Sequence, residues 1–377
     1  MQRTADENIL MGLCDDHSSV CEIAKDRAWI IEAVKTIEAD QHRSSDTHLF
    51  KLPTRVCADI DIYFKDESTH PTGSLKHRLA RSLILYGLCN GEIGRGTPLV
   101  EASSGSTAVS EAYFAQLLGL PFYAVVPVGT SETKLREIKR YGGQIHAVEA
   151  PLIYDAAINL AEDMKGYYLD QFTNAERATD WRSNNNIAES LFDQMSLERY
   201  PAPSWVVVGA GTGGTSATIG RYVRYRAEAL ANTKLCVADP EHSAFFEGYK
   251  TQSAEYTYAT KSRIEGVGRP RMEPSFLMSI VDRMMKVKDA ASFAATLWLE
   301  QETGRQFGPS TGLNFYATLV LANEMRARGE AGSIVTLICD SGSRYQDSCY
   351  DPQWLEDNGL DVTEHVSRIQ QIVQGDG

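Results

Sequence analysis

The sequence has no excess of basic residues and no long apolar run. Of its 377 residues, 37 are Lys or Arg and 50 are Asp or Glu, which gives a formal net charge of −13. Nucleic acids and anionic membranes attract basic surfaces, so this acidity argues against either as the main partner. No segment approaches the roughly 18 apolar residues of a transmembrane helix, and no secretory signal is evident. We therefore expect a cytoplasmic protein that acts on a small molecule.

Cysteine pairs with the spacing of a redox or zinc motif are also missing. The seven cysteines include no Cys-x-x-Cys pair and are odd in number. They are Cys14, Cys21, Cys57, Cys89, Cys236, Cys339 and Cys349. This pattern fits neither a disulfide framework nor a zinc site, so we expect no metal. Buried free thiols in the cytosol are the simplest interpretation.

What the sequence does contain is an alternation of short apolar strands with amphipathic helices. It predicts parallel β-sheets that helices cover on both faces, and therefore an α/β fold. Two such blocks, at 95–175 and 200–345, indicate two domains, and ligands in such folds bind at the carboxyl ends of the strands. Strands are expected at 59–64, 97–103, 122–127, 144–150, 204–210, 234–239 and 333–340, and helices at 27–40, 107–120, 131–143, 311–329 and through 219–230.

A glycine-rich loop follows the expected strand at 204–210. Glycines let the backbone approach an anion, and a helix start offers free N–H groups, so this loop suits a phosphate. The same glycines satisfy Gly-x-Gly-x-x-Gly and Asp239 ends the next strand, so a dinucleotide site of an oxidoreductase is an alternative. The loop residues are Gly209, Gly211, Thr212, Gly213, Gly214 and Thr215.

A second strand–loop–helix unit carries hydroxyl groups. Ser103, Ser104, Ser106 and Thr107 surround Gly105 at the start of the helix. Hydroxyl and N–H groups at this position suit a carboxylate, although a Ser/Thr helix cap without a ligand is the alternative. In "CDSGSRYQ", residues 339–346, a Ser-Gly pair closes the last strand, and alone it indicates only a turn.

The segment "HPTGSLKHR", residues 70–78, delivers Lys76 at the start of a helix after a Pro-Thr-Gly-Ser turn. A lysine amine is a nucleophile only when it is deprotonated, and burial or nearby positive charge lowers its pKa. We expect Arg78 and His77 to contribute that charge, unless they point to solvent or to a neighbouring helix.

Together these segments resemble the cysteine synthase family of pyridoxal phosphate (PLP) enzymes, of the fold-type-II, tryptophan-synthase-β group. Seven matching segments occur in the family's order between residues 46 and 346. This order makes the resemblance specific, and it displaces the dinucleotide interpretation. The segments are "HPTGSLKHR", "SSGSTA", "DQFTN", "GTGGT", "RIEGVG", "GPSTGLNFYA" and "CDSGSRYQ".

The resemblance implies which residues bind the cofactor and the substrate. Lys76 is the implied catalytic residue, which holds PLP and then removes the Cα proton. The other implied cofactor-binding residues are Ser106, Gly211, Thr212, Gly213, Gly214, Thr215 and Ser341. The implied substrate-binding residues are Ser103, Ser104, Gly105, Ser106, Thr107, Gln171 and Gly266.

The resemblance also implies the domain organisation. It implies two three-layer α/β domains with mostly parallel sheets and PLP in the cleft between them. The smaller domain is expected at 69–175, with the substrate-carboxylate loop. The larger is expected at 1–68 and 176–377, with the phosphate loop. A homodimer is the implied assembly.

The likeness extends to one branch, the bacterial L-cysteine desulfhydrases of the Cds1 type, through residues 27–53 and 65–78. It implies α,β-elimination of L-cysteine to hydrogen sulfide, pyruvate and ammonia. A cysteine synthase acting on an activated serine and a serine or threonine dehydratase are alternatives. Two positions depart from the family: Ser106 replaces an Asn that hydrogen-bonds PLP, and His77 replaces an Asp.

Overall fold

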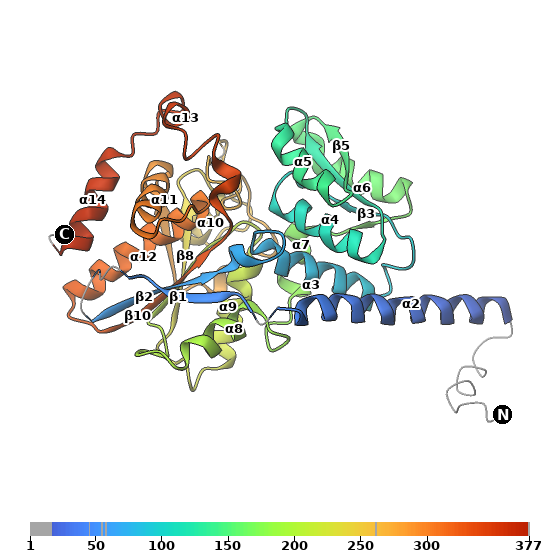
Figure 1. Cartoon of the computed structure of the whole chain (residues 1–377), viewed down its shortest axis with the longest axis horizontal. Coiled ribbons are helices and arrows are strands. Elements are labelled where there is room, and N and C mark those ends of the chain that lie inside the picture. Colours follow the sequence, from blue (N-terminus) through green and yellow to red (C-terminus); the bar gives the residue numbers. More distant parts are fainter. Residues whose placement is uncertain (1–16, 45, 54–55, 57–58, 261, 376–377) are drawn as a thin grey trace. The chain divides into compact units, whose positions relative to one another are not determined.

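The computed structural model describes residues 17–44, 46–53, 56, 59–260 and 262–375, in which helices and strands alternate (Figure 1). The helices are α2 (His17–His42), α3 (Lys76–Cys89), α4 (Ser106–Leu118), α5 (Glu132–Arg140), α6 (Ile153–Asp163), α7 (Gln171–Ala178), α8 (Ile187–Met195), α9 (Gly214–Tyr225), α10 (Ala244–Thr251), α11 (Asp289–Thr303), α12 (Pro309–Ala327), α13 (Pro352–Asp357) and α14 (Thr363–Gln374). The strands are β1 (His48–Lys51), β2 (Ile60–Asp66), β3 (Leu99–Glu101), β4 (Phe122–Pro127), β5 (Gln144–Val148), β6 (Tyr167–Tyr168), β7 (Trp205–Gly209), β8 (Lys234–Pro240), β9 (Arg283–Val287) and β10 (Gly332–Ile338). Short 3₁₀ helices are η2 (Glu67–Thr69), η3 (Ala150–Leu152), η4 (Met278–Ile280) and η5 (Gly342–Tyr345).

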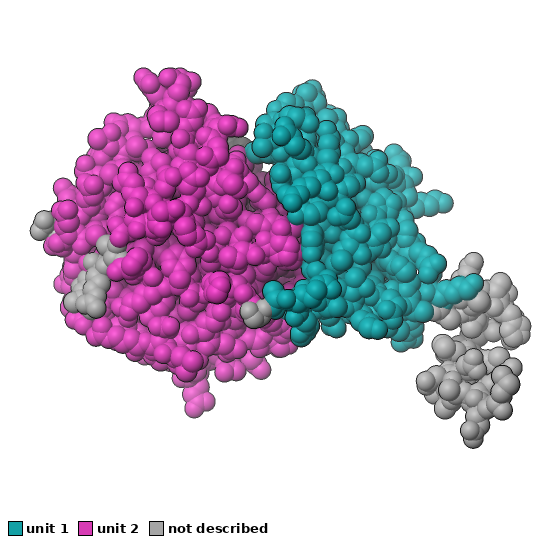
Figure 2. All heavy atoms as spheres, in the orientation of Figure 1, with its two compact units in different colours: residues 1–45, 84–104, 111–169 teal, residues 46–83, 105–110, 170–377 magenta. Residues whose placement is uncertain are grey.

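The chain forms two compact units, which Figure 2 colours separately. The first comprises the described parts of 1–45, 84–104 and 111–169, and the second those of 46–83, 105–110 and 170–377. The domain boundaries expected from the resemblance stay a prediction. No helix in the described part of the chain is both long and apolar enough to cross a bilayer.

The second unit contains a six-stranded sheet with the order β1-β2-β10-β7-β8-β9. Only β1 runs antiparallel to its neighbour, and the other pairs are parallel. Successive side chains of a strand point to opposite faces. Val207 accordingly packs among buried residues of α11 and α12, whereas Val206 and Val208 pack among those of α8 and α9. Helices on both faces confirm the expected three-layer α/β architecture of this unit.

The first unit contains a four-stranded parallel sheet with the order β5-β4-β3-β6. Val100 of β3 and Val125 of β4 form an apolar cluster with Ala157 and Ala161 of α6. All four strands lie within the block expected at 95–175, and the mostly parallel α/β fold is confirmed.

Two local expectations differ from the structure. The larger sheet is not confined to the block 200–345, because β2 inserts between β1 and β10. This pairing joins Ile60 with Gly332, which are far apart in the chain, so local hydrophobic patterning does not reveal it. The helix expected through 219–230 ends at Tyr225, and the N–H of Arg226 closes its last turn on the carbonyl of Tyr222.

Three neighbouring strands bring the expected site residues to one edge of the larger sheet. β10 pairs in parallel with both β2 and β7, so the carboxyl ends of all three strands lie side by side. The chain leaves β2 towards Lys76, β10 towards Ser341, and β7 towards the glycine loop. In open parallel sheets this edge is where ligands bind.

Candidate active site

Backbone hydrogen bonds hold the turn that precedes Lys76. Gly73 has φ +68°, a left-handed conformation that glycine adopts without steric cost. The N–H of Leu75 donates to the carbonyl of Cys339 (2.8 Å), and the N–H of Ser341 donates to the carbonyl of Gly73 (3.3 Å). These bonds fix the start of α3 beside the segment that follows β10.

Lys76 is the first residue of α3 and is partly buried. Within the described chain, no hydrogen bond or ion pair engages its Nζ. Burial lowers the pKa of Lys76, while the nearby Cys339 and Asp340 act in the opposite direction. An amine with a depressed pKa and no partner is suited to act as a nucleophile and a base.

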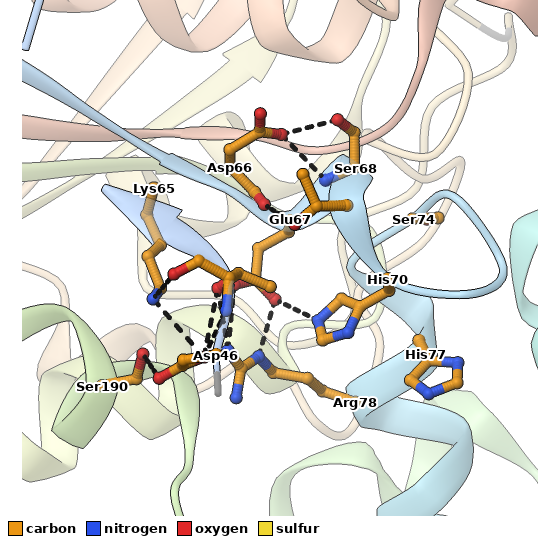
Figure 3. A network of polar contacts seen from close by, with 12 residues as sticks. Asp46, Lys65, Asp66, Glu67, Ser68, His70, Ser74, His77, Arg78 and Ser190 are labelled. Atoms are coloured by element: carbon orange, nitrogen blue, oxygen red, sulfur yellow. Dashed lines mark hydrogen bonds and ion pairs between the residues drawn. The ribbon is translucent and has the colours of Figure 1, made fainter. Parts of the chain in front are cut away.

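Arg78 does not act on Lys76. Its Nε donates to Oε2 of Glu67 (2.6 Å), and its Nη2 donates to Oδ1 of Asp46 (2.9 Å), as Figure 3 shows. Burial is what lowers the pKa of Lys76, so the expectation that Arg78 and His77 do so is wrong. The guanidinium instead anchors the first turn of α3 to the end of β2.

The partners of Arg78 form a buried polar network (Figure 3). The Glu67 side chain is fully buried. Burial alone would raise its pKa, but the charges of Arg78 and His70 hold the pKa well below the usual range. Lys65 is also fully buried, donates to Gln194 Oε1 (2.7 Å), and has a pKa that burial lowers to about 8. A network in which every charge is paired fixes α3 in one position.

His77 has a packing role. Its Nδ1 lies 3.2 Å from Oγ1 of Thr72, which also lies 2.9 Å from Oγ of Ser110. The ring stacks on His70 with centroids 5.0 Å apart. Burial lowers the pKa of His77 to about 2, so the imidazole is neutral. At this position the resemblance implies an Asp, and this chain instead makes a neutral contact there.

Two glycines of the loop after β7 are packed too tightly to be replaced by a residue with a side chain. Gly213 has φ +93°, and a Cβ there would lie 2.5 Å from the carbonyl oxygen of Ser275. A Cβ on Gly211 would lie 2.2 Å from the carbonyl oxygen of Gly266. These contacts require glycine, and they place the Gly266 loop directly against the glycine loop.

Lys76 and the glycine loop line one pocket within the second unit. Its wall also includes Leu79 from α3 and Thr215 from α9. The start of α9 supplies N–H groups and the positive end of a helix dipole, which bind phosphate. An amine without a partner and a phosphate cradle in one pocket fit PLP. Lys76 would hold the aldehyde carbon, and residues 211–215 would hold the phosphate.

Ser341 caps the short helix η5 at the same edge of the sheet. Its Oγ accepts from the N–H of Ser343 (3.3 Å). The preceding residue, Asp340, is buried, and its Oδ2 accepts from the hydroxyl of Tyr345 (2.7 Å). Burial raises the pKa of Asp340 to about 6. Sequence reasoning missed Asp340, although it lies next to Ser341.

The structure brings together two of the expected substrate-binding residues. Thr107 in the first turn of α4 donates through Oγ1 to Oε1 of Gln171, the first residue of α7, over 2.7 Å. Both side chains are buried. Ser103 and Ser104 follow β3 and belong to the first unit, whereas Gly105 and Ser106 belong to the second. The roles of all these residues stay predictions.

Sequence reasoning also missed Arg344, which lies in η5 three residues after Ser341. Its Nη1 donates to Oγ of Ser106 and its Nη2 donates to the carbonyl of Thr72, each over 2.5 Å. The available signal was its position in the segment 339–346.

Asp239, the residue behind the dinucleotide alternative, has a structural role. Its side chain is fully buried, and Oδ2 accepts from the N–H of Phe246 (2.8 Å). Burial raises its pKa to about 7. A buried helix-capping carboxyl cannot reach a ribose, so the dinucleotide alternative is wrong.

Comparison with known proteins agrees with the fold and the pocket, which together define a PLP enzyme. Residues 43–340 match the family described as pyridoxal-phosphate dependent enzyme. The chain belongs to this family, and its cofactor is pyridoxal phosphate.

Individual relatives narrow the comparison. The L-cysteine desulfhydrase Cds1 of Mycobacterium tuberculosis is 57% identical over 340 residues, which cover 89% of this chain and 92% of that protein. A cysteine synthase of Dictyostelium discoideum is 27% identical over 322 residues, or 81% of each chain. The crystal structure of a hydrogen sulfide-producing enzyme from Fusobacterium nucleatum superposes with a TM-score of 0.76 at 24% identity, covering 89% of this chain and 96% of that one. The last similarity supports the fold alone.

Proposed function

We propose that this protein is an L-cysteine desulfhydrase. The reaction consumes L-cysteine and one water and releases hydrogen sulfide, pyruvate and ammonia. The observation that carries the proposal is the 57% identity to the desulfhydrase Cds1, over nearly the full length of both chains. The pocket supplies the groups that such a reaction needs.

Lys76 has two tasks in this reaction. It holds the cofactor between turnovers, and after the substrate amine displaces it, Nζ removes the proton from Cα. PLP supplies the sink for the electrons that this proton leaves behind. Burial keeps the pKa of Lys76 low, so that the amine is available as a base. Loss of the β-thiolate from the substrate then releases sulfide.

The loop at the start of α4 binds the substrate carboxylate. Ser104, Ser106 and Thr107 provide hydroxyl groups, and Gln171, which accepts the hydrogen bond of Thr107, orients that side chain. The positive end of the α4 dipole favours an anion at this position. Ser341 would face the ring nitrogen of PLP with a neutral hydroxyl, which would not hold that nitrogen protonated and would so favour prompt β-elimination.

The test is a pair of assays on the purified, PLP-loaded protein. We expect sulfide and pyruvate from L-cysteine alone at a higher rate than cysteine from O-acetylserine plus sulfide. If L-cysteine yields neither product, the proposed function is wrong. Faster deamination of L-serine or L-threonine than of L-cysteine would identify a dehydratase instead.

A cysteine synthase is the second candidate, because a relative with that name matches 81% of this chain. Both reactions share the removal of the Cα proton and the loss of the β-substituent, so the same residues serve either one. The assay pair separates them, since only the synthase needs a second nucleophile.

The proposal includes a cytoplasmic homodimer. Cys89, Cys236, Cys339 and Cys349 are free thiols, as is usual in a reducing compartment. The resemblance to cysteine synthases supports the dimer. Light scattering on the purified protein would test this assembly, and a mass near 41.7 kDa, that of one chain, would contradict it.

A further inference from the structure

One arginine joins two parts of the candidate site that are far apart in the sequence. Arg344 is half-buried in η5, and its guanidinium donates to Ser106 Oγ and to the carbonyl of Thr72, each over 2.5 Å. A Cβ built on Gly73 would lie 3.6 Å from Nη2 of Arg344. The guanidinium therefore covers the turn before Lys76 and reaches the first residue of α4.

The chemistry of this contact fixes the direction of the Ser106 hydroxyl. A guanidinium only donates and stays protonated at any ordinary pH. The oxygen of Ser106 is therefore the acceptor, and its own proton remains available for a further acceptor. The hydroxyl acts as a donor at a helix N-terminus, where an anion is already favoured.

Arg344 also supplements the serine at position 106, where the resemblance implies an asparagine. An amide brings its own donors, whereas a serine has one proton and a shorter reach. Arg344 adds a full positive charge within 2.5 Å of that serine. Charge-assisted hydrogen bonds are about twice as strong as neutral ones.

We infer that Arg344 is a positioning residue for the α-carboxylate of the substrate. It turns the Ser106 hydroxyl into a donor for that carboxylate and adds favourable charge beside it. The inference rests on the proposed function for the identity of the substrate, and it extends that function by assigning recognition of the acid group to a charge outside the serine-rich loop.

The experiment measures binding of L-alanine and of L-alanine methyl ester to the PLP-loaded enzyme, followed by cofactor absorbance. Neither ligand carries a β-leaving group, so no elimination occurs. For Arg344→Gln we expect the Kd of L-alanine to rise about 10- to 100-fold, the loss typical of a hydrogen bond to a charged group. The Kd of the ester should stay within about twofold, since a neutral ester gains little from the charge.

Further variants separate positioning from general damage. Arg344→Lys keeps the charge and should recover part of the affinity for L-alanine. Arg328→Gln is the matched control, because Arg328 pairs with Glu330 on the surface and should leave both affinities unchanged. In the double variant Ser106→Ala/Arg344→Gln, the Kd of L-alanine should rise no further than in the weaker-binding single variant, because both changes remove one contact.

Equal weakening of acid and ester in Arg344→Gln would overturn the inference, as would additive effects in the double variant. Failure of this inference can be distinguished from failure of the proposed function. Absence of sulfide from wild-type enzyme given L-cysteine would contradict the desulfhydrase, whereas the binding comparison needs no turnover.

Discussion

The backbone N–H of Leu75 donates a hydrogen bond to the carbonyl of Cys339, with 2.8 Å between nitrogen and oxygen. Leu75 precedes Lys76, and Cys339 precedes Asp340 and Ser341. The bond therefore fixes the lysine and the segment after β10 in one geometry, and it explains why Asp340, the buried acid directly after Cys339, can influence the lysine.

Asp340→Asn should change the proton affinity of Lys76. Asp340 opposes the effect of burial on Lys76, so its neutralisation should lower the pKa of Lys76 further. The rate at which cofactor-free protein takes up PLP, which needs the neutral amine, should then reach its plateau at lower pH. The difference should appear above about pH 6, where Asp340 itself is charged.

The matched control for that variant is Asp347→Asn, an exposed carboxylate in the same segment. It should leave the pH profile of PLP uptake unchanged. A shift to higher pH in Asp340→Asn, or no shift, would show that Asp340 does not act on Lys76.

Gly213→Ala should weaken cofactor binding. Any residue other than glycine in this left-handed conformation carries a strain of about 1–2 kcal/mol, and the alanine would carry it too. In addition, its Cβ would meet the carbonyl oxygen of Ser275 at 2.5 Å and the backbone of Phe276 at 2.6 Å. We expect PLP affinity, measured by titration of the cofactor-free protein, to fall at least about tenfold.

Gly129→Ala is the control variant, because it introduces the same backbone strain without a steric clash. Gly129 has φ +85°, close to that of Gly213, but nothing lies within 4 Å of its built Cβ. It should lower the unfolding temperature slightly and leave PLP affinity intact. Equal PLP affinity in the two variants would argue against the glycine loop as the phosphate site.

Arg78→Leu should destabilise the fold, since it leaves Glu67 buried without its main cation. Loss of one partner of a buried pair costs about 3–5 kcal/mol. The wild-type pKa of Glu67 is depressed, so its contribution to stability is present above pH 4.5 and is lost as the pH falls. In the variant, burial raises that pKa, and protonation relieves the penalty. The difference in unfolding free energy between wild type and variant should therefore shrink towards pH 4.5 in urea titrations.

The comparison for Arg78 is Arg199→Leu, which removes a pair with Asp59 whose side chains are 53% and 62% exposed. Exposed pairs contribute about 0–1 kcal/mol, so this variant should unfold almost like wild type. A similarly small effect of Arg78→Leu would mean that the network does not hold α3.

Thr107→Val should raise the KM for L-cysteine and lower stability. It removes the hydroxyl that donates to Gln171 and leaves a buried amide oxygen without that donor, a loss of about 1–3 kcal/mol. Thr251→Val removes a hydrogen bond of the same 2.7 Å length at an exposed helix end. Its effect on KM and unfolding temperature should be small. If both variants change KM alike, Thr107 has no special role in binding.

Much of the fold could be predicted because its signals are local. The apolar run at 122–127 is β4 residue for residue, and the glycines around 209–214 mark the β7–α9 turn. The partner of β2 could not be predicted in this way. β2 pairs with β10 across most of the chain, and nothing near Ile60 indicates which strand lies beside it.

In the candidate site, too, the local features could be predicted and the long-range contacts could not. Lys76 and the glycine loop follow from motifs, because each needs particular residues at a fixed spacing. The contacts that tune them are tertiary. Glu67 looks like an exposed acid in "KDES" but is buried, and its carboxylate accepts a hydrogen bond from Arg78. Arg344 and Ser106 are 238 positions apart, and only the folded chain brings them together.

The central claim is that Lys76 drives elimination of sulfide from L-cysteine. The most direct test measures sulfide and pyruvate together, from L-cysteine alone, for wild-type enzyme and for Lys76→Ala supplied with PLP. We expect equal amounts of the two products from wild type. We expect a rate at least about a hundredfold lower in the variant, as befits loss of a general base. Absence of both products from wild type, or an undiminished rate in Lys76→Ala, would contradict the claim.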